Sequence, residues 1–134
     1  MVGRVPKHAG TATLAIDRLL SVVLSRTEFN VDPAFDPKKC RRDAFGVSWQ
    51  DPVDIVLRFR ADQAPYVRER VWHPSQKVAA SPDGGVQLAF RAGGPFEILR
   101  WILGWGDAVE VISPTELRDE VQNTLRAAMS LYRA

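Results

Sequence analysis

The stretch FEILRWILGWGDAVEVISP, residues 96–114, specifies a helix, a corner and a strand in direct succession. Its first part repeats apolar residues at the three- and four-residue spacing of one helical face: Phe96, Ile98, Leu99, Ile102 and Leu103. Gly104 predicts the end of that helix, and Trp105-Gly106-Asp107 predicts a tight corner. Apolar side chains then alternate over residues 109–112 as they do in a strand. Nothing in this unit suggests catalysis, so the function depends on what packs around it.

The composition is that of one ordinary globular domain. The chain has 134 residues, of which 46% are hydrophobic and 25% are charged, so it can bury a core of normal size. The net charge is only +2, but residues 1–50 hold eight Lys and Arg against five Asp and Glu. This basic excess leaves room for an anionic partner without requiring one.

The cysteine content and the apolar runs predict a cytoplasmic location. Cys40 is the sole cysteine, which excludes an internal disulfide and suits a reducing compartment. The longest apolar run, residues 14–24, is interrupted by Asp17 and Arg18. It is therefore too short and too polar to span a membrane or to act as a secretion signal, and we expect no membrane partner.

The first fifty residues are predicted to form little regular structure. Residues 1–10 have no periodicity and read as a mobile arm. Residues 11–25 favour one or two strands, although a helix over residues 15–24 has a compatible spacing. A ribbon this short is marginal in water, so we expect the segment at residues 14–24 to add to another chain or to fold back on its own sheet. Asp36 before Pro37 predicts the start of a short basic helix, for which a solvated face is favoured over phosphate binding.

The remainder predicts alternating strands and helices. A half-buried strand is expected from Val53 to Arg60, and a helix at about residues 62–71 with the apolar stripe Ala64, Val67 and Val71. Two strands at residues 77–81 and 85–91 flank the turn Pro82-Asp83-Gly84. After the strand at residues 109–112, the sequence Ser113-Pro114-Thr115-Glu116 predicts a capping box. The last helix has a predicted packing face of Leu117, Val121, Leu125, Ala128 and Tyr132.

This order predicts an α+β fold of the ferredoxin-like type. The β-α-β-β-α-β succession corresponds to an antiparallel four-stranded sheet with two helices on one face and a closing C-terminal helix. The other face should be open, and alternation assigns to it Asp54, Val56, Arg58, Arg60, Gln87, Ala89, Arg91, Glu110 and Ile112. Three arginines on an uncovered sheet are the feature most suggestive of function.

Known catalytic and metal-binding patterns are missing from the sequence. His8 and His73 are the only histidines, and neither they nor Cys40 have a partner at metal-ligand spacing. No nucleophile elbow, phosphate loop or dinucleotide fingerprint occurs. We therefore predict no catalytic residue, no metal and no cofactor, and expect His73 to pack or hydrogen-bond at a helix end.

Two hypotheses remain for the exposed arginines. Arg58, Arg60 and Arg91 could clamp phosphates, with Arg68 and Arg70 nearby on the first helix. The alternative, which is slightly favoured, is that they form salt bridges with Asp54, Glu110 and Glu69 or bury their stems in a dimer interface. Base stacking is not favoured, because the predicted open face offers no aromatic side chain.

The tryptophans Trp101 and Trp105 have two interpretations as well. Trp101 lies off the main apolar stripe of its helix, and Trp105 lies in the corner after it. Large aromatic residues are mostly buried, so anchoring of the core is favoured. An exposed tryptophan at either position would mark an interface.

Long parts of the sequence resemble a known family. The run VDIVLRFRADQAPYVRERVWHPSQ, a strand pair with DGG at its turn, and FEILRWILGWGDAVEVISPTELRDEV before a closing helix resemble the C-terminal extension of WYL-domain transcriptional regulators. The upstream TATLAIDRLLSVVLS, followed by FNVDPAFDP, resembles the last strand of the WYL module and its exit linker. The resemblance covers residues 11–132.

The resemblance implies a bacterial regulator with a helix-turn-helix, a WYL module and an extension of ferredoxin-like fold. In such proteins the WYL module is an Sm-like barrel proposed to sense a ligand, in several cases single-stranded DNA or another nucleic acid. The extension is thought to help in dimerisation and, in some members, to contact the effector. Asp17-Arg18-Leu19 is similar to the family motif near the end of the barrel, in which the arginine is a proposed effector contact.

The departures from the family pattern limit what is implied. No Trp-Tyr-Leu triplet, complete barrel or helix-turn-helix occurs in the sequence, so the chain looks like the C-terminal piece of a longer regulator. We expect an arm at residues 1–10, the end of a WYL module and a linker at residues 11–50, and the extension at residues 51–134.

Three functions are therefore considered. The first is a non-enzymatic regulatory and oligomerisation domain, acting as a homodimer. The second is a binding module for single-stranded nucleic acid or a nucleotide-type effector. The third is a small metabolite-binding or enzymatic domain, and its only support is that ferredoxin-like folds serve many different functions.

Overall fold

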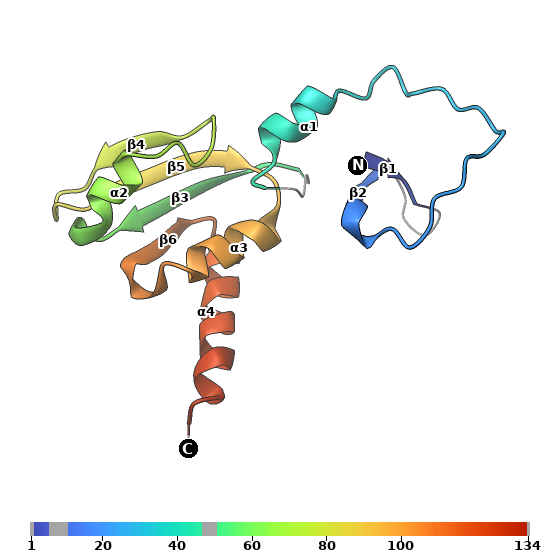
Figure 1. Cartoon of the computed structure of the whole chain (residues 1–134). Helices are drawn as coiled ribbons and strands as arrows, with labels where there is room; N and C mark the ends of the chain where they lie inside the picture. Colours follow the sequence, from blue (N-terminus) through green and yellow to red (C-terminus); the bar gives the residue numbers. More distant parts are fainter. Residues whose placement is uncertain (1, 6–10, 47–50, 134) are drawn as a thin grey trace.

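A four-stranded antiparallel sheet forms the centre of the molecule. The computed structural model describes residues 2–5, 11–46 and 51–133. The sheet has the order β4-β5-β3-β6, and its strands are β3 (Val53–Phe59), β4 (Lys77–Ala80), β5 (Val86–Ala92) and β6 (Val109–Ser113) (Figure 1). Helices α2 (Ala64–Arg68) and α3 (Pro95–Leu103) pack on one face of the sheet, and α4 (Thr115–Ser130) closes the chain. The predicted ferredoxin-like α+β fold is confirmed.

Strand alternation places the core between the sheet and its helices. The inward positions of β3 and β5 are almost fully buried: Ile55, Leu57, Phe59, Val86, Leu88 and Phe90. The two strands pair along their whole length, with Leu57 opposite Leu88. Ile98 and Ile102 of α3 and Val67 of α2 complete the apolar cluster. Burial of this cluster is the main favourable term in folding.

The predicted hairpin turn between β4 and β5 is confirmed. Gly84 has φ of +82°, a backbone conformation that side chains with a Cβ rarely adopt. At Gly85 the restriction is steric instead, because a Cβ there would lie 2.3 Å from the carbonyl oxygen of Phe59. The glycine thus permits the close approach of the turn to the central strand.

The helix–corner–strand unit at residues 96–114 forms as predicted, with one correction. Gly104 ends α3, and a 3₁₀ turn (Gly106–Ala108) leads into β6. Phe96, however, is 60% exposed and lies beneath the guanidinium of Arg100, which is 4.5 Å from the ring centroid. The reason is angular: Phe96 precedes the buried Ile98 by two residues, which is about 200° around the helix.

The helix predicted at about residues 62–71 is shorter in the structure. A 3₁₀ turn (Ala61–Gln63) precedes α2, which already ends at Arg68, and the predicted stripe residue Val71 is exposed. The turn that follows is fixed by the side chain of Gln76. Its Oε1 accepts hydrogen bonds from the backbone N–H of Trp72 at 2.6 Å and of His73 at 3.2 Å. Together with a bond from Nε2 of Gln76 to the Arg70 carbonyl, this contact holds the residues after α2 in a turn.

The last helix differs from prediction at both ends. Its N-cap is Pro114, which makes no side-chain capping bond, so the predicted capping box is not formed. Ser113 instead ends β6, where it pairs with β3. Leu117 is buried, but the predicted packing face is exposed from Leu125 onward. Figure 1 shows the reason, since α4 runs away from the sheet after its first turns.

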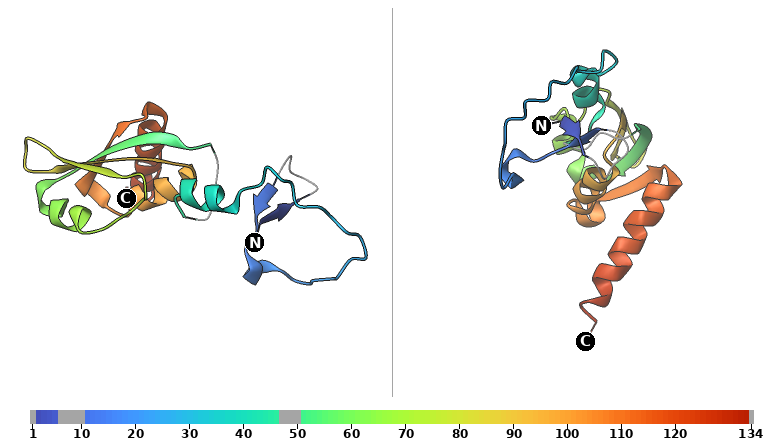
Figure 2. Two further views of the ribbon diagram at one scale, coloured as in Figure 1. Left: turned by 90° about the horizontal axis from the view of Figure 1, so that it is seen from above. Right: turned by 90° about the vertical axis from the view of Figure 1, so that its right-hand side faces the viewer.

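The N-terminal residues form a small separate ribbon. β1 (Val2–Arg4) pairs antiparallel with β2 (Thr11–Thr13), so part of the predicted arm is a strand, whereas residues 1 and 6–10 lie outside the described chain. The longer strand expected over residues 14–24 is not formed. A 3₁₀ turn (Ile16–Arg18) occurs there, and the segment does not join the four-stranded sheet (Figure 2). Its apolar side chains from Ile16 to Leu24 remain exposed, whereas Leu14 is half-buried.

The short basic helix is confirmed as α1 (Pro37–Asp43). Asp36 caps it, and its Oδ1 accepts from the backbone N–H of Lys38 at 2.8 Å. Pro37 occupies the first turn, where its missing N–H costs nothing. The helix thus connects the N-terminal ribbon to the main domain.

Candidate functional site

The open face of the sheet carries arginines that are paired with carboxylates. Arg58 on β3 lies directly across from Glu110 on β6, and the two side chains form an ion pair. Arg91 on β5 lies across from Asp54 on β3, with 2.7 Å between Nη1 and Oδ2. The strand register itself therefore places opposite charges side by side, which stabilises an antiparallel pair modestly.

Arg60, just beyond the end of β3, is paired twice. Its Nη2 lies 3.0 Å from Asp62, and its Nη1 lies 2.7 Å from Asp107 in the corner after α3. The pKa of Asp62 is lowered to about 2, and the hydrogen bond from Arg60 makes the largest contribution to this shift. The pKa of Arg60 is raised, chiefly by its hydrogen bond to Asp62 and by the charge of Asp107. Both groups are exposed, so the contribution to stability is that of a surface pair.

The predicted arginine set is only partly brought together. Arg58, Arg60 and Arg91 are exposed on or beside the open face, as expected. Arg68 and Arg70 belong to α2 and the turn after it, and Arg70 lies over the ring of Trp72. Arg18 lies in the N-terminal 3₁₀ turn, apart from the sheet (Figures 1 and 2). A phosphate clamp would therefore use the three sheet arginines without the other three, and it would compete with their carboxylate partners.

Trp101 and Trp105 are half-buried within an aromatic cluster on the helix-covered side. The ring of Phe59 lies 6.1 Å from Trp101 and 5.1 Å from Trp105, and Trp72 contacts both tryptophans. Their packing against the core agrees with an anchoring role. Their predicted role in an interface stays a prediction.

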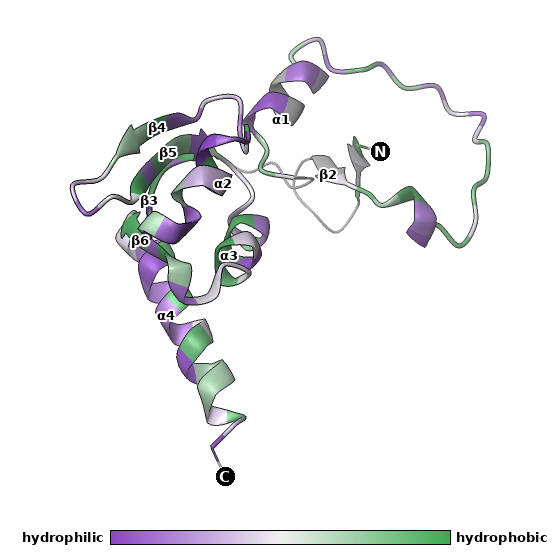
Figure 3. Cartoon of the chain, turned by 60° about the vertical axis from the view of Figure 1, so that its left-hand side comes forward, coloured by the Kyte–Doolittle hydropathy of each residue, from purple (hydrophilic) through white to green (hydrophobic). Residues whose placement is uncertain are grey.

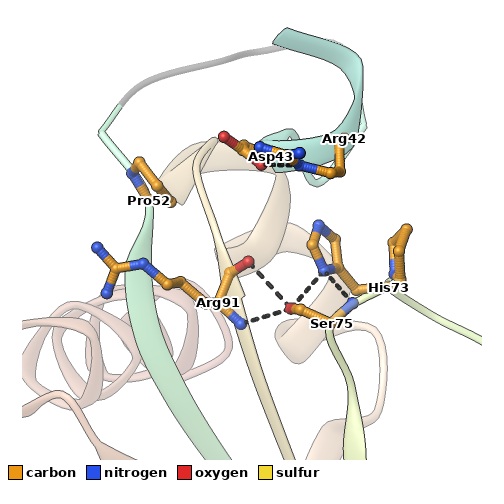
Figure 4. A pocket seen from close by; sticks show the side chains of 7 residues that line it. Arg42, Asp43, Pro52, His73, Ser75 and Arg91 are labelled. Carbon is orange, nitrogen blue, oxygen red and sulfur yellow. Dashed lines mark hydrogen bonds and ion pairs between the residues drawn. The ribbon is translucent and has the colours of Figure 1, made fainter. Parts of the chain in front are cut away.

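A cleft of about 370 Å³ lies where α1 meets the sheet. Its lining includes Arg42 and Asp43 of α1, His73 and Ser75 of the turn before β4, and Arg91 of β5 (Figure 4). The two guanidinium groups are already paired, Arg42 with Asp43 at 2.9 Å and Arg91 with Asp54. The cleft thus combines two guanidinium groups, both of them ion-paired, with one carboxylate and one imidazole.

His73 and Ser75 join the turn to β5. Nδ1 of His73 lies 2.8 Å from Oγ of Ser75 and accepts from the Ser75 backbone N–H at 3.2 Å. Oγ of Ser75 in turn accepts from the Arg91 backbone N–H at 2.9 Å. Burial lowers the pKa of His73, against the opposing effects of the Arg42 carbonyl and the Asp43 carboxylate. Nδ1 of His73 thus serves as a hydrogen-bond acceptor, as the prediction of a packing or hydrogen-bonding role expects, but in the turn before β4 rather than at the end of a helix.

A contact that the sequence did not reveal attaches α1 to the domain. The ring of Phe45 stacks on Phe90 with centroids 5.4 Å apart and lies 5.1 Å from Trp101. The backbone of Gly93 donates to Asp43 at 2.7 Å and accepts from Phe45 at 3.0 Å. The only sign of this contact in the sequence was an aromatic residue shortly after a predicted helix.

The described residues show neither a metal centre nor a membrane-spanning segment. Over residues 2–5, 11–46 and 51–133, no group of three or more His, Cys, Asp or Glu side chains could hold a metal ion. The helices in these same ranges lack the combination of length and apolar character that crossing a bilayer requires.

Fold and surface together define a ferredoxin-like α+β domain with an ion-paired open sheet face. The chain belongs to the WCX-domain family, whose model matches residues 51–129. The match confirms the resemblance to the C-terminal extension of WYL-domain regulators.

One solved structure gives the fold an independent comparison. Proteasome accessory factor B/C (PafBC) of Arthrobacter aurescens is similar over 63% of this chain, with a TM-score of 0.53 and 24% identity. The similar part is 13% of the PafBC chain, so the present chain corresponds to a small part of that protein. At this identity the likeness concerns the fold alone. No curated protein sequence matches the chain significantly.

Proposed function

We propose that the chain is the regulatory and oligomerisation domain at the C-terminal end of a WYL-type bacterial transcription regulator. The family match over residues 51–129 is the observation that supports this most strongly. In this proposal residues 51–134 are the extension, residues 11–50 are the end of a WYL module with its linker, and the protein works in the bacterial cytoplasm. It acts by association and effector response and catalyses no reaction.

The chemistry of the surface supports a non-catalytic role. Catalytic groups need a concave site with positioned acids, bases or nucleophiles. The cleft at His73 contains a buried imidazole whose Nδ1 is engaged by Ser75, and its arginines are paired. A domain of this kind is better suited to hold subunits together and to transmit a ligand signal than to transform a substrate.

Two measurements test the proposal. Sedimentation velocity over a concentration series should show reversible formation of a homodimer, and a monomer at every concentration would refute the oligomerisation role. The effector role is tested by the melting temperature of the chain in the presence of nucleotides and short single-stranded oligonucleotides. A ligand that binds the folded state raises that temperature, and no shift with any of these probes would count against a nucleotide-type effector.

The exposed arginines favour one second candidate, a single-stranded nucleic-acid binding module. The side chains of Arg58, Arg60 and Arg91 are roughly half exposed, so each could exchange a carboxylate for a phosphate. Binding of single-stranded DNA should then weaken steeply with salt. Arg58→Gln with Arg91→Gln should reduce the salt slope by about 0.7 for each phosphate that is no longer neutralised, whereas Arg68→Gln on α2 should leave it unchanged. Absence of binding at low salt would eliminate this candidate.

A further inference from the structure

A buried ring nitrogen without a hydrogen-bond partner faces the cleft between α1 and the sheet. His73 is only 3% exposed, and its Nε2 forms no hydrogen bond within the described ranges 2–5, 11–46 and 51–133. The Arg42 carbonyl is near enough to oppose the lowering of the His73 pKa, but its geometry is not that of a hydrogen bond to Nε2. A buried polar atom without a partner costs free energy, so its presence in a folded protein calls for an explanation.

The other ring nitrogen determines what Nε2 can offer. Nδ1 accepts a hydrogen bond from the Ser75 backbone N–H at 3.2 Å, so Nδ1 carries no proton. The proton of the neutral imidazole is therefore on Nε2, which makes Nε2–H a donor. In Figure 4 the Nδ1 edge of the ring faces Ser75, and the opposite edge faces Arg42 and Asp43 across the cleft. The cleft thus contains a buried donor that lacks an acceptor.

The charges that line the cleft favour an anionic acceptor. The guanidinium groups of Arg42 and Arg91 outnumber the single carboxylate, that of Asp43. Figure 3 shows that the described residues of α1 are largely hydrophilic, and Arg42 reaches the cleft from the last turn of this helix. Arg91 lies at the rim, and its guanidinium is turned away from His73 (Figure 4). Arg42 is therefore the cation placed to share a ligand with Nε2, and Arg91 adds positive charge beside it.

The ion pair of Arg42 leaves its side chain able to bind a ligand. Asp43 accepts from Nε of Arg42 at 2.9 Å, and a guanidinium has five N–H donors. The Arg42 side chain is 66% exposed, so this contact with the neighbouring residue is a surface pair of small net strength. An incoming anion can share the guanidinium, or replace Asp43 on it, without the cost of breaking a buried pair.

We propose that the cleft binds a small organic anion, a carboxylate or a phosphate ester, whose oxygen accepts from Nε2–H of His73 and pairs with the guanidinium of Arg42. Pro52 and Pro74 border the cleft and provide apolar surface for a compact organic body. The volume of about 370 Å³ lies at the lower end of small-molecule sites. A ligand in this position joins α1 to the turn before β4, so it holds the linker helix against the domain. The inference goes beyond the proposed function, because binding here requires neither a dimer nor a nucleic acid.

NMR titration of the chain tests the site with two probes, inorganic phosphate and benzoate, at constant ionic strength. Saturable shifts of the His73 ring and of the Ser75 amide are expected, with a dissociation constant on the order of millimolar for ligands of so few atoms. A response to phosphate alone would identify a phosphate ligand, and a response to benzoate alone would identify a carboxylate with an apolar body. The absence of saturable shifts with both probes would overturn the proposal.

Two substitutions of His73 separate the function of Nε2 from that of Nδ1. In His73→Asn the amide oxygen can replace Nδ1 as the acceptor for Ser75, but no donor remains at the position of Nε2. In His73→Gln the longer side chain can place an amide N–H near the position of Nε2. His73→Asn and Arg42→Gln should each raise the dissociation constant by about tenfold, and His73→Gln should raise it less. Because Arg42 is exposed, its variant tests the site even if the buried His73 tolerates no change.

Arg68→Gln is the matched control for the loss of one positive charge. Arg68 is an exposed arginine of α2 and is not among the described residues that line the cleft. Its replacement should leave the dissociation constant unchanged, and an amide spectrum like that of the parent chain shows that a variant is folded. Unchanged binding in both His73→Asn and Arg42→Gln, or an equal loss in Arg68→Gln, would overturn the site.

Discussion

Replacing Phe45 by alanine should release α1 from the four-stranded domain without unfolding that domain. Phe45 lies two residues after the end of α1, and its ring stacks on Phe90 and contacts Trp101 of the core. Backbone hydrogen bonds of Asp43 and Phe45 with Gly93, and a parallel bridge from Ala44 to Gly93, also hold this junction. The strands and helices of the core do not depend on Phe45, because it packs against the edge of the buried cluster.

The magnitude follows from the burial of the ring. Truncation of a fully buried phenylalanine to alanine costs about 3–5 kcal/mol. Phe45 is half-buried, so we expect about 2 kcal/mol, applied to the docking of α1. A change of that size increases the undocked population by about 30-fold.

Limited proteolysis with trypsin measures that population. Cleavage within α1, which contains basic residues such as Lys38 and Arg42, should accelerate by up to about 30-fold when opening is fast relative to cleavage. Phe29→Ala is the matched control, because Phe29 is 85% exposed in the N-terminal segment and should leave the rate unchanged. An unchanged cleavage rate in Phe45→Ala would show that the aromatic contact does not hold α1.

Three further predictions concern single residues. The pKa of His73 is lowered in the folded state, so the free energy of unfolding should decrease as the pH falls below about 6.5, by at most about 1.4 kcal/mol per pH unit, and His73→Gln should remove this dependence in urea titrations. The pKa of Asp62 is lowered in the folded state, so its contribution to folding stability is present above about pH 4 and is lost as the pH falls toward 2. In Arg60→Gln, an NMR titration of the Asp62 carboxyl should show its midpoint returned toward about 3.9. A midpoint equal to that of the parent chain would contradict the pairing. Gly85→Ala should cost more than about 2 kcal/mol in chemical denaturation because its Cβ would collide with the Phe59 carbonyl, and a change below about 0.5 kcal/mol would refute this.

Local sequence patterns determined most of the fold. Alternation along β3 and β5, the Gly84 turn and the helix-ending Gly104 each act over a few residues, and their succession was enough to predict a four-stranded antiparallel sheet. Alternation also placed Arg58 and Glu110 on the same open face, where the register makes them partners. What such patterns could not give was the pairing itself, since strand register was not specified by the residues of one strand.

The failures have a common physical origin in long-range contacts. The Gln76 side chain accepts hydrogen bonds from the backbone of the turn that follows α2, and helical periodicity does not encode this contact. The apolar spacing of α4 predicted a packing face along the whole helix, but this spacing does not indicate where along the helix the packing stops. Leu117 packs inside the domain, and Leu125 does not. The same limit applies to Phe45, whose partner Phe90 is 45 residues away in sequence.

Whether a second copy of the chain covers part of its surface is tested most directly by hydrogen exchange at increasing protein concentration. Amides of the contact surface should exchange more slowly as the concentration rises, while those of the central strands β3 and β5 remain equally protected throughout. Exchange that is the same at every concentration over all described residues would contradict the proposed oligomerisation.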